Sequence, residues 1–386
     1  MSIYLDHAAT VPMVDAAITA LNEQMRAVGN ASSLHSDGRA VRKAVEDARL
    51  HISEIAGCEA SEIIFTGTGT EADNLAVKGF FWKAIASDPQ RRIILTSPIE
   101  HHAIKDPIEW LAEHDGAEVI EIPVDARGVI DIDWARTYIS ANSDRIALIS
   151  VMHSNNEIGS LQPIAELVQA AGDIPVHSDA VQSFGKIDFN FAELGLTAAT
   201  ISSHKIGGPL GVAALILRRG LDLTPVTHGG GQERDVRSGT FNAPSIVAFA
   251  AAAREAAQTR NENFKKVSHL RDQAKAKLQE AIPGSVINGE PGLPGILNMR
   301  FPNTESEALL LLLDSEGISA SAGSACSAGV ARPSHVLLAL GCSEAEAMSS
   351  LRFSFGTTST EGDVQRLVEV LPSVVQRAQA AFSVKK

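Results

Sequence analysis

A lysine and an aspartate close two strand-like runs in the middle of the chain. Lys205 follows an apolar run and stands within the segment 202–209, Ser-Ser-His-Lys-Ile-Gly-Gly-Pro. A lone lysine is most often a solvated surface residue, but an amine made nucleophilic by burial and neighbouring cations can form a Schiff base. Asp179 ends the preceding run, where a carboxylate either caps a helix or pairs with a protonated pyridine nitrogen. Pyridoxal enzymes combine such a lysine with such an aspartate, so the two residues together favour a pyridoxal site.

A glycine-rich turn with the sequence TGTGTEADN, residues 66–74, separates a predicted strand from a predicted helix. Backbone N–H groups at such a helix N-terminus bind phosphate without a cationic side chain. The turn also matches GxGxxA, the dinucleotide-binding fingerprint, which leaves an oxidoreductase as an alternative. Asp88, near the distance at which that fingerprint needs an acid, stands in a Ser-Asp-Pro turn and not at a strand end. A phosphate site for pyridoxal phosphate agrees better with Lys205 and Asp179.

Cys326 lies in a run of eleven small residues, 319–329, with the sequence SASAGSACSAG. Such a run cannot pack a core, so we expect an exposed loop, and composition alone leaves a linker with an incidental cysteine equally open. A nucleophile that enters a pocket and then carries a product away needs a loop of this kind. An unperturbed thiol is only roughly 3% thiolate at pH 7, so a base or a positive field has to lie nearby.

Two further side chains are of types that bind substrates or cofactors. Arg352 stands between Leu351 and Phe353 in an apolar run, which predicts a buried arginine. Such an arginine either holds a carboxylate through two hydrogen bonds or forms an internal salt bridge. His101 suits an aromatic plate or an acid–base group over a ring. The twelve histidines show no HExxH or paired-cysteine spacing, so we predict no metal site.

The composition argues against several classes of protein. The 386 residues carry 33 Lys and Arg against 46 Asp and Glu, a formal charge of −13, which is unfavourable for a general nucleic-acid or anionic-membrane binder. The longest leucine run, 309–313, is far shorter than the roughly 20 residues of a bilayer span. A basic and apolar secretory signal is not expected from the first residues. Three cysteines without framework spacing exclude a disulfide scaffold, and we expect a cytoplasmic protein.

The elements that position these residues alternate between helix and strand over 40–217. Apolar periodicity predicts helices at 39–56, 71–84 and 106–113, and β-branched runs predict strands at 62–65, 92–96, 118–122, 146–152, 174–177, 199–202 and 212–217. Such alternation indicates βαβ units and a mostly parallel sheet covered on both faces, with ligands at the carboxyl ends of its strands. A long helical stretch over 245–278, interrupted or bent, contains a domain boundary and precedes a second α/β segment.

Taken together, these motifs resemble those of the pyridoxal-phosphate-dependent cysteine desulfurases of the class V aminotransferase superfamily. The matching segments keep the family's order along the chain, and they are YLDHAAT at 4–10, GTEADN at 69–74, EHH at 100–102, NNEIG at 155–159, SHK at 203–205, GGGQER at 229–234, RSGT at 237–240, GSAC at 323–326 and LRFS at 351–354. The long GSAC loop is similar to that of one group within the family. The resemblance implies fold type I, with a large domain at 13–260 and a small α/β domain of 1–12 and 261–386 that carries the Cys326 loop.

The resemblance also implies a role for each site residue. Lys205 would hold pyridoxal 5′-phosphate as a Schiff base, His101 would stack on its ring, and Cys326 would accept sulfur; these three are the predicted catalytic residues. Asp179 would pair with the pyridine nitrogen and Gln182 with the phenolic oxygen. The remaining cofactor contacts would come from Gly69, Thr70, Asn156, Ser202 and His204, joined by Thr240 of the partner subunit in a homodimer. Asn156 and Arg352 would bind the substrate carboxylate.

The implied reaction converts L-cysteine to L-alanine and leaves the sulfur as a persulfide on Cys326. An iron–sulfur scaffold, a tRNA-thiolation enzyme or another thiol protein would then accept it. Selenocysteine lyase is the alternative within the superfamily, and a dinucleotide-binding oxidoreductase is the alternative from another class. Val11 replaces a second threonine of the family pattern, and Gly69 stands where many members have alanine. The sequence lacks the longer tail with which some members dock a scaffold, which leaves that partner open.

Overall fold

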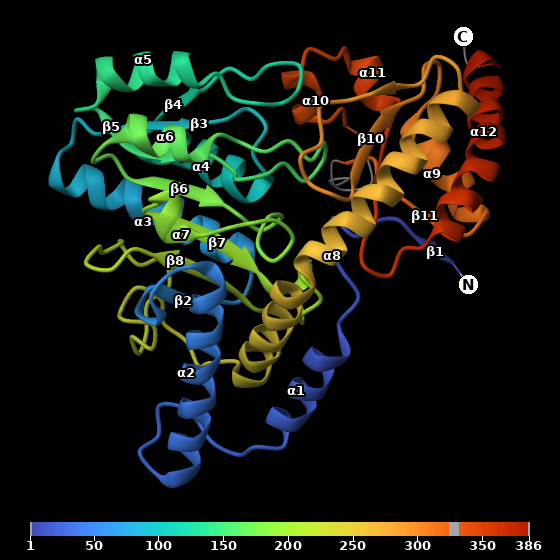
Figure 1. Ribbon diagram of the computed structural model, residues 1–386. Coiled ribbons are helices and arrows are strands. Elements are labelled where there is room, and N and C mark those ends of the chain that lie inside the picture. The colour runs from blue at the N-terminus through green and yellow to red at the C-terminus, as the bar shows by residue number, and fades with distance from the viewer. Residues whose placement is uncertain (1, 324–331, 385–386) are drawn as a thin grey trace.

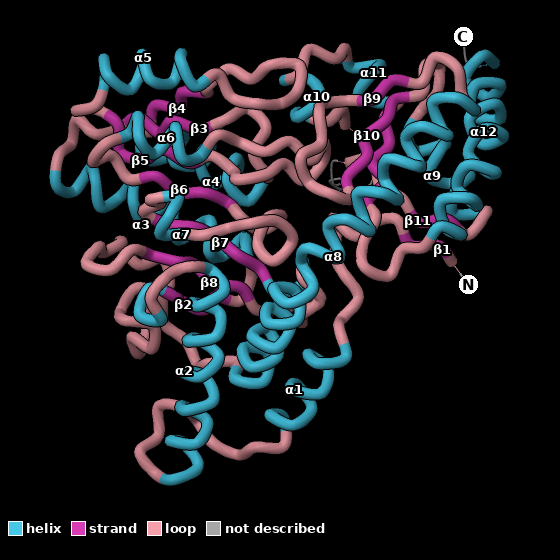
Figure 2. The backbone as a smooth tube through the Cα atoms, in the orientation of Figure 1, coloured by secondary structure: helices cyan, strands magenta, loops and turns pink. Residues whose placement is uncertain are grey.

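The computed structural model describes residues 2–323 and 332–384, so the predicted nucleophile Cys326 lies outside the described residues. The chain forms a larger and a smaller body, and the long helix α8 (Ala243–Ala281) extends from one to the other (Figure 1). The strands of the larger body lie side by side in one sheet, while those of the smaller body form two short sheets (Figure 2).

Seven strands make the sheet of the larger body, in the order β2-β8-β7-β6-β5-β3-β4. Their bounds are β2 Ile63–Thr66, β3 Ile93–Thr96, β4 Glu118–Glu121, β5 Ile146–Ser150, β6 Val176–Asp179, β7 Ala198–Ser202 and β8 Ala213–Leu217. The strands β3 to β7 pair in parallel, whereas β8 runs antiparallel to both β7 and β2. The prediction of an α/β fold with a mostly parallel sheet is confirmed.

Helices cover both faces of this sheet. α3 (Gly69–Ser87) and α4 (His102–Asp115) bury Phe80, Phe81 and Leu111 against one face. The other face is covered by the first part of α8 together with α1 Asp15–Met25, α2 Ser36–Ala56, α5 Ile132–Asn142, α6 Ile164–Ala171 and α7 Phe191–Leu194. All residues of β2, β3, β5, β6, β7 and β8 are buried, which explains why most of these strands are rich in apolar residues, whereas β6 carries the buried polar residues His177, Ser178 and Asp179. Two short 3-10 turns, Ala60–Glu62 and Ser203–Lys205, adjoin the sheet.

The smaller body contains an antiparallel sheet of order β12-β10-β9 and a parallel pair of β1 and β11. Its strands are β1 Ile3–Tyr4, β9 Val286–Ile287, β10 Ile296–Arg300, β11 Ile318–Ser319 and β12 Ser350–Ser354, and its helices are α9 Ser306–Ser315, α10 His335–Ala339, α11 Glu344–Met348 and α12 Glu361–Val384. Leu5 joins the core of this body, so the N-terminal residues pack with the C-terminal part of the chain. No helix among the described residues has the length and hydrophobicity needed to cross a membrane.

α8 is one continuous helix of 39 residues and is not interrupted. Its sequence has no glycine, and its one proline, Pro244, stands in the first turn, where the missing N–H breaks no helical hydrogen bond. The buried residues of α8 belong to the core of the larger body up to Ala253 and to that of the smaller body from Val267. The boundary predicted near residue 260 falls between them, and the division into domains stays a prediction.

Candidate active site

A cavity of about 590 Å³ lies beyond the carboxyl ends of the parallel strands, with residues of both bodies in its wall. The fold brings most of the predicted site residues to this cavity, namely Gly69, Thr70, His101, Asn156, Asp179, Gln182, Ser202, His204, Lys205 and Arg352. Ser321 and Gly323, which belong to the small-residue run 319–329 and precede Cys326 within it, line the cavity as well. Thr240 lies exposed on the segment before α8 and, in this single chain as described, is not part of the wall.

Lys205 is placed by the 3-10 turn that directly follows β7. Its Nζ donates hydrogen bonds to the backbone carbonyls of Ala8 and Ala9, each over 2.7 Å. Burial lowers the pKa of Lys205 to about 8, and the positive charge of Arg352 acts in the same direction, while Asp179 and Asp6 oppose the shift. A substantial fraction of this amine is therefore neutral near physiological pH, which is the form that attacks a carbonyl carbon.

Asp179 is the last residue of β6, and its Oδ1 accepts the N–H of Val181 over 2.9 Å. Burial raises the pKa of this carboxyl to about 6, although the Val181 hydrogen bond and the charge of Lys205 lower it. A carboxylate that has lost most of its hydration gains strongly from a cation placed against it. Asp179 is therefore suited to holding a proton on a ring nitrogen.

The N-terminus of α3 forms another part of the cavity wall. Thr68 caps the helix, since its Oγ1 accepts the N–H of Glu71 over 3.0 Å. A Cβ on Gly69 would lie 3.2 Å from Cγ2 of Val181, so a larger residue would require the Val181 side chain, just beyond β6, to shift. The Glu71 carboxylate pairs with Nε of Arg237 at 2.7 Å, which offsets a negative charge in the first turn. The helix terminus is therefore left attractive to an anion.

His101 caps α4 through its ring, because Nδ1 accepts the N–H of Ala103 over 3.1 Å. The ring is accessible from the cavity, yet the surrounding protein desolvates it enough to lower its pKa to about 4, with a further contribution from the positive charge of Lys205. His101 is thus neutral at pH 7, with its proton on Nε2. His204, which directly precedes Lys205, is also neutral at pH 7, because burial lowers its pKa to about 4.

A second lysine, which the sequence analysis missed, stands behind Gln182. Lys186 Nζ donates to Gln182 Oε1 over 2.9 Å, and Gln182 Nε2 donates to the carbonyl of Ala8 over 2.8 Å. Ala8 is also an acceptor for Lys205, so the two lysines are joined through this carbonyl and this amide. Burial lowers the pKa of Lys186 to about 7, and the charges of Lys205 and Arg352 add to the shift. The only sequence signal was the spacing of four residues between Gln182 and Lys186.

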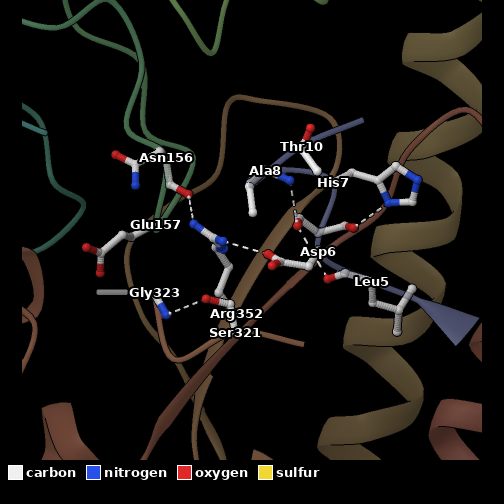
Figure 3. A network of polar contacts seen from close by, with 12 residues as sticks. Leu5, Asp6, His7, Ala8, Thr10, Asn156, Glu157, Ser321, Gly323 and Arg352 are labelled. Carbon is white, nitrogen blue, oxygen red and sulfur yellow. Dashed lines mark hydrogen bonds and ion pairs between the residues drawn. The ribbon is translucent and has the colours of Figure 1, made fainter. Parts of the chain in front are cut away.

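Arg352 extends from β12 into the cavity wall and is engaged on both sides (Figure 3). Its Nη2 lies 2.7 Å from Oδ1 of Asp6, and its Nη1 donates to the carbonyl of Asn156 over 2.9 Å. Its Nε is buried and has no hydrogen-bond partner among the described residues. The internal salt bridge foreseen as one possibility for Arg352 is therefore present, and the same guanidinium also faces the cavity.

Buried acids without a role in the sequence analysis lie around the same cavity. Glu100 accepts the N–H of Met152 at both carboxylate oxygens, over 2.9 and 3.1 Å, and burial raises its pKa to about 8. Asp73 is buried beside Asp179, and burial together with that neighbouring charge raises its pKa well above the usual range. Glu100 belongs to the EHH motif and Asp73 to the GTEADN motif, so the sequence shows both residues. Their protonation depends on burial in the folded chain, which the motifs alone do not show. The pKa of Asp179, about 6, is lower than that of Glu100, so of these two carboxyls Asp179 ionises first as the pH rises.

The topology disfavours the dinucleotide reading of the glycine-rich turn. That fingerprint follows the first strand of a parallel sheet, at the centre of the fold. Here the turn follows β2, which is an edge strand and runs antiparallel to its neighbour β8. Within the described residues, no group of three or more His, Cys, Asp or Glu side chains is arranged to hold a metal ion.

Comparison with known proteins places the chain in a family. The family model described as aminotransferase class-V matches residues 3–367. The chain belongs to the class-V aminotransferase family. A relative of this family named IscS-like cysteine desulfurase, from Mycobacterium tuberculosis, is 47% identical over 383 residues, which cover 98% of this chain and 97% of the relative.

Two solved structures are similar to this chain over most of its length. A NifS-like protein superimposes with a TM-score of 0.90 at 32% identity and covers 98% of this chain and 100% of that chain. A structure described as SspA in complex with cysteine has a TM-score of 0.80 at 30% identity and covers 93% of this chain and 100% of that chain. The predicted class V membership and the fold-type I architecture of these desulfurases are confirmed.

Proposed function

We propose that this class-V protein is a cysteine desulfurase that uses pyridoxal 5′-phosphate, converts L-cysteine to L-alanine and supplies the sulfur for iron–sulfur cluster assembly or another thiolation pathway. The observation that carries the proposal is the meeting of Lys205 and Asp179 in one cavity, an amine whose pKa is lowered to about 8 and a buried carboxylate at the next strand end. Relatives named cysteine desulfurase support the substrate, at 47% and 39% identity over 98% of the chain.

The chemistry of the wall fits pyridoxal phosphate. The capped N-terminus of α3, with Ser202 close by in the wall, offers donors to a phosphate. Asp179 offers an anion to a ring N–H, and the neutral ring of His101 offers an aromatic face. Lys205 offers the amine that would attach the cofactor. Each chemical part of the cofactor therefore has a matching residue, and class-V enzymes of this kind depend on it.

When bound, the cofactor would supply an electron sink that makes the Cα–H of an amino acid acidic. Lys205 would take the Cα proton on its neutral amine, for which a pKa near the working pH is suited. Asp179 would keep a proton on the ring nitrogen by staying ionised beside it. Arg352 and the Asn156 side chain would hold the substrate carboxylate and so orient the Cα–H toward Lys205.

Cys326 would act as the sulfur acceptor, although it lies outside the described residues. Its thiolate attacks the substrate sulfur, so that an S–S bond forms while the Cβ–S bond of the substrate breaks. The electron pair left on Cβ would be protonated, Lys205 would return its proton to Cα, and alanine would be released. The persulfide on Cys326 is then available to an acceptor thiol. Ser321 and Gly323 in the cavity wall support this role, because they bring the chain to the site three residues before Cys326.

We further propose a homodimer in which Thr240 of the partner subunit completes the phosphate site. The exposed position of Thr240 in the single chain supports this, because a residue that serves its own cavity would be expected in its wall. An iron–sulfur scaffold as the sulfur acceptor and a cytoplasmic location stay predictions.

The proposal is tested with the purified protein. We expect a yellow chromophore that borohydride fixes to Lys205, as located by peptide mapping, and equal amounts of alanine and transferred sulfur from L-cysteine. Lys205→Ala should lose both, whereas Lys43→Ala, at a position with 75% side-chain exposure on α2, should lose neither. A protein that takes up no pyridoxal phosphate would refute the proposal.

The role of Cys326 is tested separately. Cys326→Ser should retain the chromophore and yield no alanine from cysteine, while Cys342→Ser, a change at a half-buried cysteine of the smaller body, serves as the matched control. Wild-type alanine production by Cys326→Ser would remove the persulfide assignment. Activity of that variant on selenocysteine alone would favour the selenocysteine lyase alternative.

A further inference from the structure

The buried charge of Arg352 already has a counter-anion inside the protein. Leu351 and Phe353 on either side are fully buried, and the Arg352 side chain is 5% exposed. A guanidinium taken out of water to this extent is stable only when a carboxylate and hydrogen-bond acceptors surround it. Asp6 supplies that carboxylate at 2.7 Å, and the Asn156 carbonyl supplies an acceptor at 2.9 Å (Figure 3).

Asp6 is held beside Arg352, a residue of the cavity wall, by its backbone. Its carbonyl accepts the hydroxyl of Tyr4 over 3.0 Å, and Asp6 forms a β-bridge to Ser354, two residues beyond Arg352 on the same strand. The Asp6 side chain is 22% exposed, in contrast to the buried guanidinium that it contacts. The carboxylate thus engages Nη2 of Arg352 from a fixed backbone, on the same guanidinium that faces the cavity.

The remaining charges around Arg352 do not replace Asp6. Burial raises the pKa of Glu157, which favours the neutral acid, and its Oε2 accepts the hydroxyl of Ser334 over 2.6 Å. Lys205 is a neighbouring cation whose pKa Arg352 lowers. Asp6 is therefore the ionised group that balances Arg352 when no substrate is bound.

We propose that Asp6 competes with the carboxylates of substrate and product for Arg352 and thereby sets how weakly both bind. This inference rests on the proposed function, because it takes Arg352 to be the carboxylate site. An incoming carboxylate has to share the guanidinium with Asp6, and the repulsion between the two anions weakens binding. The same repulsion speeds the departure of alanine, whose carboxylate is identical in type to that of the substrate. Asp6 in this sense sets the affinity of the carboxylate site and is not a catalytic residue.

The decisive variant is Asp6→Asn, whose amide oxygen still accepts from Nη2 of Arg352 but carries no charge. Propionate, which has a carboxylate and no amine, and the uncharged propionamide are the probes, and binding to the cofactor-loaded protein is measured by calorimetry. We expect Asp6→Asn to bind propionate on the order of tenfold more tightly than the wild type, with propionamide unchanged. Asp37→Asn removes a charge at a position with 69% side-chain exposure on α2 and controls for net charge.

Kinetics provide an independent readout. The KM for L-cysteine and the inhibition constant of L-alanine should both fall in Asp6→Asn by the factor seen for propionate. A purely structural role of Asp6 predicts a raised KM, because a displaced Arg352 would bind substrate less well. Unchanged or weaker propionate binding in Asp6→Asn would overturn the inference.

An arm with Arg352→Gln separates this inference from the proposed function. If Arg352→Gln loses propionate binding while Asp6→Asn binds like the wild type, Arg352 keeps its role and the competition is refuted. If Arg352→Gln binds propionate like the wild type, the carboxylate site itself is misassigned.

A second variant covers the case in which Asp6→Asn does not fold. In Asp6→Ala, formate should raise the melting temperature more than in the wild type, because it replaces the missing carboxylate on Arg352, and formamide should have no such effect. Equal formate shifts in both proteins would also overturn the inference.

Discussion

The lowered pKa of Lys205 predicts how fast the cofactor-free protein takes up pyridoxal phosphate at each pH. The reacting form is the neutral amine. With a pKa of about 8, about one quarter of Lys205 is neutral at pH 7.5, against roughly 0.1% for a lysine of pKa 10.5, a difference on the order of 200-fold. The attachment rate should therefore rise with pH and level off near pH 8 to 9, well below the range of an ordinary lysine.

Removal of Arg352 should move this profile in a defined direction. Among the charges around Lys205, Arg352 lowers its pKa, so Arg352→Gln should raise the apparent pKa and slow attachment at pH 7.5. Arg366→Gln, at a position with 45% side-chain exposure on α12, should leave the profile unchanged. Stopped-flow absorbance of cofactor-free protein mixed with pyridoxal phosphate measures the rate. A profile that keeps rising to pH 10 in the wild type, or a downward shift in Arg352→Gln, would refute this account of Lys205.

Three further predictions concern other parts of the site. Asp179→Ala should still bind the cofactor but lose turnover, because no carboxylate then keeps the ring nitrogen protonated; near-normal alanine production would contradict that role. Lys186→Met should stabilise the protein at pH 7. The folded pKa of Lys186, about 7, lies below its ordinary 10.5, so the unfolded chain binds more protons between these values and wild-type stability rises with pH across that window. The advantage of Lys186→Met in urea unfolding should therefore shrink from pH 7 toward pH 10, and a constant difference would show that the charge is not responsible. His101→Phe should cost about 1 kcal/mol of stability because the helix cap is lost, whereas His101→Asn should keep the cap and lose only the ring contact, seen as weaker cofactor retention. Equal melting temperatures for both His101 variants would count against the capping role.

Much of the fold could be predicted because its signals are local. The run IALI at 146–149 is apolar throughout, since both faces of the sheet are covered, and α2 shows the helical spacing of Val41, Val45 and Ile52. The antiparallel direction of β8 was not predictable in this way, because strand direction depends on which partner the chain meets after a turn. For the stretch that became α8 we predicted an interruption or a bend, and the interruption is wrong because α8 is one continuous helix. Between Ala253 and Val267 the helix passes from one core to the other, so its apolar periodicity is weak there.

The sequence by itself determined the chemical inventory of this protein: a carboxylate at the end of one strand, an amine after the next, a glycine-rich helix start of the kind that suits a phosphate, and the motif order of its family. Tertiary structure decided the state of these groups. Asp6 and Arg352 are 346 residues apart and meet only because β12 and the N-terminal segment pair. The lowered pKa values of Lys205 and Lys186 and the raised pKa of Glu100 come from desolvation by segments distant in sequence. Hydrophobic periodicity is a property of neighbouring residues, whereas burial and charge pairing depend on the packing of the whole chain, so only the folded structure fixes them.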